Sequence, residues 1–286
     1  MPEMNIVRLK INKTSDLKFN WFTNYEDYVA RNIQSFDIDP RLKNSSPPPV
    51  LVLCHEFFDA MPIMIFEYSE LGWVEKLVDK SPEVDTKNMF QWVNSEPMSK
   101  NVTKILNPKE TFGQDMRTKE ISVGDRIEVA PKSSILMNSF AELIAKTGGA
   151  VLAIDYGENH AFSDSLRGIA QHRFVNSEDL LELAGSADLS AYVNFLALKD
   201  SATRIQGIAE PTILTQGEFL KSMGLPQRCE YLKMGNPGKA EELDLQVRRL
   251  IDSDEMGQVY KFMYVGLESA GDVFPFLSNP EDVVFL

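Results

Sequence analysis

Short blocks of apolar residues alternate with longer amphipathic stretches, a pattern that predicts strands and helices in turn. Residues 50–54 and 150–154 are apolar runs with the length of buried strands. A helix capped by Ser133 or Ser134 precedes the second run, and the glycine pair at 148–149 ends it. This order of helix, glycine turn and apolar strand is typical of half a parallel-sheet unit, so the sequence predicts an α/β fold.

The stretch after the first apolar run predicts an insertion into a single domain that spans residues 1–286. Residues 63–78 have the pattern of two strands joined by a tight turn at Gly72. Residues 79–131 are polar, irregular and interrupted by prolines, so we expect them to be peripheral. Together these segments form the expected insertion, residues 63–131, which is placed to wall a pocket.

The C-terminal third predicts helices followed by one more strand. Residues 187–198 contain a candidate strand or helix start. A capped helix is expected from Thr215 to Gly224, and residues 240–251 have the spacing of an amphipathic helix. Residues 259–265 are strand-like. These elements are the expected helical additions to the sheet.

Charge and composition narrow the classes of partner. The net charge of −13, from 42 acidic and 29 basic residues, opposes binding to nucleic acid and favours a basic or arginine-bearing protein segment. No run of 18 apolar residues is present that would span a membrane. The two cysteines, Cys54 and Cys229, are too few for a disulfide framework or a zinc ribbon, which fits a reducing compartment.

Acidic residues follow both of the predicted buried strands. Glu56 and Asp59 come directly after the first strand, beside His55, and Asp155 follows the second. The carboxyl ends of parallel strands are where ligands bind in open α/β sheets. Carboxylates there would hold a planar guanidinium through paired hydrogen bonds and orient its reacting nitrogen.

Two other interpretations of the same residues remain open. Glu56 would then cap a helix N-terminus, and Asp59 would pair with a surface lysine. A metal site is also possible in principle, because positions 55 and 59 share one face if the segment is helical. Zinc hydrolases with a helical His-Glu motif need a second histidine where this chain has Asp59.

Several short segments, in matching order and with similar spacing, resemble the MidA-like methyltransferases. That family includes a mitochondrial arginine methyltransferase that assists assembly of respiratory complex I. The matching segments are residues 55–62 (HEFFDAMP), 147–149 (TGG), 155–157 (DYG), 167–168 (RG), 187–190 (ADLS), 193–195 (VNF), 216–220 (QGEFL) and 256–257 (MG).

The resemblance implies a class I S-adenosylmethionine-dependent methyltransferase, with a Rossmann-like α/β sheet, in the mitochondrial matrix. Its implied substrate is an arginine of a complex I subunit, and its cofactor is S-adenosylmethionine. Residues 55–62 would follow the fourth strand beside the methyl donor, and Asp155 and Tyr156 would end the fifth strand and bind substrate. Glu56 and Asp59 would orient the guanidinium, while His55 would accept the released proton.

The sequence departs from the family pattern at its N-terminal end. The family's glycine-rich Glu-Leu-Gly-Pro-Gly-Arg-Gly loop between the first strand and its helix has no counterpart in this sequence. We therefore expect an N-terminally incomplete sheet in which residues 50–54 form an uncovered apolar edge. Glu3 would correspond to the acidic residue on the donor's ribose. The alternative function is a non-catalytic assembly factor or scaffold that has lost the cofactor site.

Overall fold

The computed structural model describes most of the chain from residue 48 onward. The described residues are 10–11, 17–18, 48–82, 89–106, 121–171, 173–177 and 179–277. Strands β1 (Lys10–Ile11) and β2 (Leu17–Lys18) form a separate antiparallel pair. Glu3, the expected ribose contact, lies outside the described residues.

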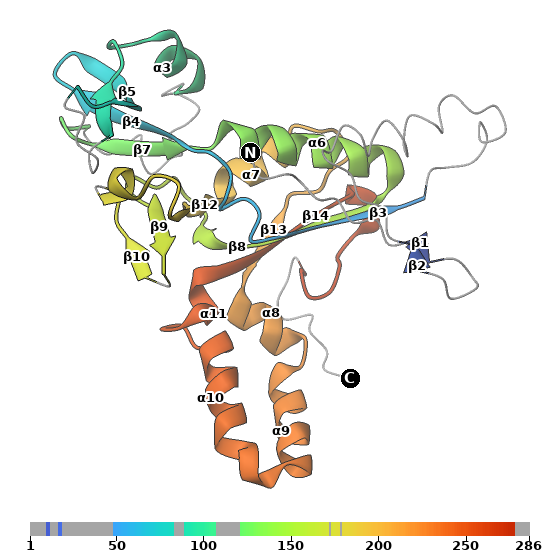
Figure 1. Cartoon of the computed structure of the whole chain (residues 1–286). Helices are drawn as coiled ribbons and strands as arrows, with labels where there is room; N and C mark the ends of the chain where they lie inside the picture. The colour runs from blue at the N-terminus through green and yellow to red at the C-terminus, as the bar shows by residue number, and fades with distance from the viewer. Residues whose placement is uncertain are drawn as a thin grey trace.

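A mixed sheet built around β8 (Gly149–Glu158) forms the centre of the structure (Figure 1). β8 pairs in parallel with β3 (Val50–His55) and, at its carboxyl end, with β12 (Val193–Asn194). On its other side it pairs antiparallel with β14 (Tyr260–Gly266), which pairs antiparallel with β13 (Thr212–Thr215). The two predicted apolar strands are therefore parallel neighbours, and their carboxyl ends lie at the same end of the sheet.

Helices α6 (Pro131–Thr147) and α7 (Phe195–Ala202) pack against each other and against β8. Burial of apolar side chains between these helices and the sheet is the main source of stability for this part of the fold. The core that they share with the sheet includes Met137, Phe140, Ile144, Val151, Ala153, Leu198 and Met263.

The start of α6 differs from the prediction, which was wrong in giving the cap to Ser133 or Ser134. The helix begins at Pro131, and Ala130 precedes it without a side-chain cap. Proline suits the first helical position because its missing N–H would have had no partner there. The predicted end is confirmed: Gly148 has a φ of +73°, and its N–H donates to the carbonyl of Ile144 over 2.8 Å.

β3 is only half buried, whereas the sequence predicted a buried strand. Leu51 and Leu53 are 82% and 67% exposed, while Cys54 on the opposite face is buried in the core. Among the described residues β3 pairs with β8 alone. Within the part of the chain that the structure describes, β3 is therefore an edge strand with an exposed apolar face.

A second, antiparallel sheet follows the first strand in the order β6-β5-β4-β7. The predicted hairpin is confirmed as β4 (Met64–Ser69) and β5 (Gly72–Lys80), and Gly72 has a φ of +107° at its turn. The sheet has its own core, which includes Phe66, Trp73, Val102, Leu106 and Ile127.

The prediction of an irregular region over residues 79–131 was wrong in part. It contains β6 (Phe90–Asn94), α3 (Lys100–Ile105) and β7 (Arg126–Val129). These elements have four to six residues each, too short for a periodic pattern to identify them. β6 and β7 are held by pairing with β5 and β4, and α3 is held by packing of Val102 into the core of this sheet, so their stability depends on contacts outside the local sequence.

Beyond β8, a small antiparallel sheet consists of β9 (Arg167–Ala170), β10 (Arg173–Val175) and β11 (Asp188–Ser190). A single 3₁₀ turn, η1 (Asp179–Leu183), lies between β10 and β11 in the chain. Residues 187–198 thus contain β11, β12 and the start of α7, which agrees with the expected strand or helix start.

The C-terminal helices are α8 (Gln216–Ser222), α9 (Leu225–Gly235), α10 (Ala240–Ile251) and α11 (Met256–Val259), with 3₁₀ turns η2 (Pro237–Lys239) and η3 (Glu268–Ala270). The predicted cap is confirmed: Thr215 and Glu218 form a reciprocal capping box at α8. α9 and α10 form a hairpin that projects away from the sheet (Figure 1). Within the described ranges, no helix is both long and apolar enough to cross a bilayer.

Candidate active site

Asp155 holds the turn that follows β3. Its Oδ2 accepts hydrogen bonds from the backbone N–H groups of Phe57, Phe58 and Asp59 over 3.1, 3.0 and 3.3 Å. Its Oδ1 accepts the N–H of Tyr156 over 3.0 Å. A carboxylate at the end of β8 thus fixes the path of the chain at the end of β3, the neighbouring strand.

Burial makes the charge of Asp155 costly. The residue is fully buried, and this burial, together with the nearby charge of Asp59, raises the pKa of the Asp155 carboxyl from 3.8 to about 7. The backbone N–H groups of Asp59, Tyr156 and Phe58 act in the opposite direction but are outweighed. Because backbone groups occupy both oxygens, Asp155 is placed to shape the site rather than to contact a ligand.

Asp59, Tyr156 and Ser190 form a hydrogen-bonded cluster beside this turn. The Tyr156 hydroxyl donates to Asp59 Oδ2 and also contacts the hydroxyl of Ser190. Burial, followed by the hydrogen bond to Asp59, raises the pKa of Tyr156 to about 12, so the phenol stays a neutral donor. The other oxygen, Asp59 Oδ1, is buried and has no hydrogen-bond partner among the described residues. An unpaired buried carboxylate oxygen is a position at which a cationic ligand can bind.

Arg167, the first residue of β9, stacks on the Tyr156 ring of this cluster and on two further aromatic rings. Its guanidinium carbon is 4.7 Å from the ring centre of Tyr156, 4.4 Å from that of Tyr192 and 5.3 Å from that of Phe174. Such contacts hold a guanidinium by its attraction to the ring faces. The sequence analysis included Arg167 and Ser190 only within segments that resemble the family. No local sequence pattern shows which aromatic rings or hydroxyl groups these two side chains contact.

Glu56 and His55 are exposed at the end of β3. Glu56 has a φ of +46°, in the left-handed region, and its Oε1 accepts a hydrogen bond from the Tyr260 hydroxyl over 2.9 Å. The structure therefore shows a turn here instead of the helix that Glu56 would cap, and no lysine among the described residues forms an ion pair with Asp59. Among the described residues no group of three or more metal-binding side chains is present.

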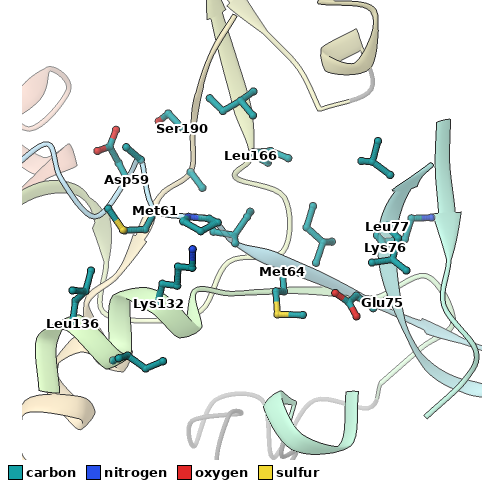
Figure 2. A pocket seen from close by; sticks show the side chains of 18 of the residues that line it. Asp59, Met61, Met64, Glu75, Lys76, Leu77, Lys132, Leu136, Leu166 and Ser190 are labelled. Carbon is teal, nitrogen blue, oxygen red and sulfur yellow. The ribbon is translucent and has the colours of Figure 1, made fainter. Parts of the chain in front are cut away.

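Asp59 lines a pocket of about 870 Å³ (Figure 2). The pocket lies between the central sheet, the first turns of α6 and the second sheet, β6-β5-β4-β7. This volume is within the range of small-molecule and side-chain binding sites. Most of its lining is apolar, including Met61, Pro62, Met64, Leu77, Leu136, Leu166 and Leu189. His55, Glu56, Asp155 and Tyr156 are not part of the lining, so Asp59 is the predicted site residue that reaches the pocket.

The geometry thus brings most of the predicted residues together around one turn. His55, Glu56 and Asp59 come from the end of β3, and Asp155 and Tyr156 from the end of β8, as the parallel pairing requires. A family described as "Putative S-adenosyl-L-methionine-dependent methyltransferase" matches residues 18–213, more than half of the chain. The chain belongs to this methyltransferase family. The predicted family and its cofactor class, S-adenosylmethionine, are therefore confirmed.

Curated relatives of this methyltransferase chain are named "Protein arginine methyltransferase NDUFAF7, mitochondrial". The zebrafish protein (Danio rerio) is 32% identical over 75% of this chain and 47% of its own length. The Xenopus tropicalis protein is 34% identical over 74% and 46%, and the human protein 33% over 73% and 44%. The chain spans about half the length of the curated relatives it matches.

Solved structures confirm the predicted fold class. A Burkholderia thailandensis protein described as a "likely methyl transferase", bound to S-adenosyl-homocysteine, matches with a TM-score of 0.59 at 18% identity. The match covers 78% of this chain and 55% of that one. A second structure from the same organism, a native one, gives a TM-score of 0.61 at 19% identity over 76% of this chain and 55% of its own. The methyltransferase chain therefore has the mixed α/β fold of these proteins.

Proposed function

We propose that this chain supplies the substrate side of a protein-arginine methyltransferase that acts on a complex I subunit in mitochondria. The observation that carries the proposal is Asp59: one carboxylate oxygen is held by Tyr156, and the other is buried and unpaired beside an apolar pocket. A guanidinium in this pocket would donate to the free oxygen. The names of the curated relatives support the choice of arginine, of mitochondria and, by resemblance, of complex I.

Each residue of the site has a part that follows from its contacts. Asp59 binds and orients the guanidinium, because a fixed carboxylate aligns the planar fork and localises electron density on the attacking nitrogen. Tyr156 and Ser190 fix the rotamer of Asp59. Asp155 positions the main chain of the turn, a role that replaces the direct substrate contact expected from the sequence.

His55 and Glu56 complete the proposed site at the exposed end of β3. His55 is open to solvent, and its imidazole would accept the proton that the guanidinium releases on methylation. The Tyr260 hydroxyl orients Glu56 from β14. S-adenosylmethionine, when bound, supplies the electrophilic methyl group.

The fit of the methyl donor to this chain is partial. The turn after β3 and the open edge of that strand agree with the expected position beside the donor. Glu3, the proposed ribose contact, lies outside the described residues, and the sequence has no counterpart of the glycine-rich loop. We further propose that residues 1–286 belong to one domain in which residues 63–131 are the insertion that walls the pocket.

We expect Asp59→Asn to lower methyl transfer to arginine by about 100- to 1,000-fold, because the amide keeps the shape of the side chain but loses the charge. The measurement is transfer of radiolabelled methyl from S-adenosylmethionine to an arginine-containing substrate. Asp254→Asn, at an exposed position that does not line this pocket, makes the same charge change and should keep wild-type rates. Equal incorporation by Asp59→Asn and wild type would refute the role of Asp59.

The second candidate function is a non-catalytic assembly factor that keeps the substrate-binding surface. The observation that favours it is that Asp59, Tyr156 and Ser190 form their cluster from the turn after β3, from β8 and from β11 alone, so a basic segment could bind there whether or not the chain binds the donor. Calorimetry distinguishes the two functions. Binding of S-adenosylmethionine by the chain supports the enzyme, whereas binding of an arginine-bearing partner without any binding of the donor supports the scaffold.

A further inference from the structure

A buried carboxylate faces the pocket from the side away from Asp59. Glu75 lies on β5, is 6% exposed and lines the same pocket. Figure 2 shows Asp59 and Ser190 at one end of this view and Glu75, beside Met64, at the other. The two carboxylates come from different parts of the fold, one from the central sheet and the other from the inserted hairpin.

Glu75 has only a neutral partner among the described residues. The side-chain amide of Asn101, on α3, donates to Glu75 Oε2 over 3.0 Å, and no described group bonds to Oε1. Oε1 is not among the buried unpaired atoms of the described residues, so it is open to the pocket, where a cationic group of a ligand can reach it. A carboxylate that is mostly shielded from water attracts a cation more strongly than a fully solvated one does.

The pocket's own lysines do not supply this cation. Lys76 is next to Glu75 in β5 but pairs with Glu67, with Nζ and Oε1 separated by 3.8 Å. Lys132 projects from the first turn of α6 and forms no ion pair with any residue that the structure describes. The carboxylate thus remains available to a charged group of a ligand.

Mostly apolar side chains line the space between the two carboxylates, and the ammonium group of Lys132 also lies there, which disfavours a further cation in the middle of the pocket. Met61, Pro62 and Met64 lie along the chain that joins β3 to β4, and Leu136 and Leu189 lie across from them. A ligand that reaches from Asp59 to Glu75 must therefore be cationic at both ends and apolar in between. A peptide segment with two basic side chains meets this description.

We propose that Glu75 binds a second cationic side chain of the substrate. This inference rests on the proposed arginine methyltransferase function. The pocket then selects segments in which an apolar spacer separates the target arginine at Asp59 from a further lysine or arginine at Glu75. Because Asn101 occupies Oε2, a single oxygen remains, so a lysine ammonium fits as well as a guanidinium.

The test is a set of four fluorescent peptides for each spacer length. The target position carries arginine or neutral citrulline, and the second position carries lysine or apolar norleucine. The spacer is apolar and varies from about two to six residues, since each extended residue adds about 3.4 Å. Dissociation constants are measured by fluorescence anisotropy, which does not require the methyl donor.

With the wild-type chain, at the spacer that fits, lysine at the second position should tighten binding about tenfold over norleucine. Glu75→Gln keeps an oxygen for the Asn101 amide but loses the charge, so this preference should disappear. Glu70→Gln makes the same change of net charge at the exposed turn between β4 and β5, outside the pocket lining, and should keep the preference, which excludes a general effect of the acidic surface. Asn101→Ala, which leaves the charge of Glu75 intact, should also keep it.

The outcomes separate this inference from the function on which it rests. A lysine preference that persists in Glu75→Gln, or is absent at every spacer length in the wild type, overturns the role of Glu75. Binding that responds to the second position but is equal for arginine and citrulline contradicts the proposed target site at Asp59 instead. Thermal unfolding of each variant confirms that the folded protein is being compared.

Discussion

Replacing Asp155 with alanine is expected to lower the free energy of unfolding by about 3–6 kcal/mol and to abolish substrate binding. The change leaves the N–H groups of Phe57, Phe58 and Asp59 without their acceptor. Each backbone donor that loses its partner in a buried place costs about 1–3 kcal/mol. Denaturant unfolding measures the loss, and peptide binding shows whether the turn still presents Asp59.

The same variant tests the protonation of Asp155. Its pKa is raised from 3.8 to about 7 in the folded protein, so between these pH values the native state holds a proton that the unfolded chain has released. In this pH range the unfolded state binds fewer protons than the native state. The contribution of Asp155 to the free energy of unfolding therefore falls as the pH rises from 4 to 7. A pKa shift of this size changes the contribution of Asp155 to the free energy of unfolding by roughly 4 kcal/mol at most.

The difference in unfolding free energy between wild type and Asp155→Ala should therefore be largest near pH 4 and shrink toward pH 7.5. Taking the difference removes the titration of other carboxylates, which both proteins share. Asp254→Ala, at an exposed position, serves as the control and should show a small and nearly constant difference. A difference that grows with rising pH would contradict the raised pKa.

The sequence was sufficient to predict which strands carry the site. The apolar runs at 50–54 and 150–154 were each followed by acidic residues, and parallel neighbours bring such ends together. The closeness of Asp59 to Asp155 and Tyr156 was therefore predictable in outline.

The role of Asp155 could not be read from the sequence because its partners are backbone groups. It binds the amide of Phe57, 98 residues away, and backbone amides leave no trace in residue types. An acidic residue at a strand end has the same appearance whether it binds a substrate or a turn. Only the burial of the side chain and the occupation of both its oxygens separate these roles.

Glu75 is a second residue whose role could not be predicted from the sequence. In sequence it is one of several charged residues in the second strand of the predicted hairpin. Its side chain meets Asn101 on α3, an element in the region that was predicted to be irregular. The sequence could predict a wall for the pocket but not a charge within it.

Gly157→Ala is the second change from which we expect a large effect. Gly157 pairs with Val193 where β12 runs parallel to the end of β8. A β-carbon at position 157 would lie 2.0 Å from the carbonyl oxygen of Val193, closer than any non-bonded contact allows. The clash involves backbone rather than a flexible side chain, so β12 must move away from β8. We expect a loss of at least about 3 kcal/mol in unfolding free energy.

The displacement would also reach the site, because Ser190 lies just before β12 in the chain and meets the Tyr156 hydroxyl. Peptide affinity should therefore fall in Gly157→Ala even at a temperature where the variant remains folded. Gly235→Ala, at the end of α9, is the matched control: nothing lies within 4 Å of its added β-carbon. Alanine there should change stability by less than about 1 kcal/mol and leave binding intact. Wild-type stability and affinity in Gly157→Ala would show that the close approach of β12 is not needed to hold Tyr156 and Asp59 in place.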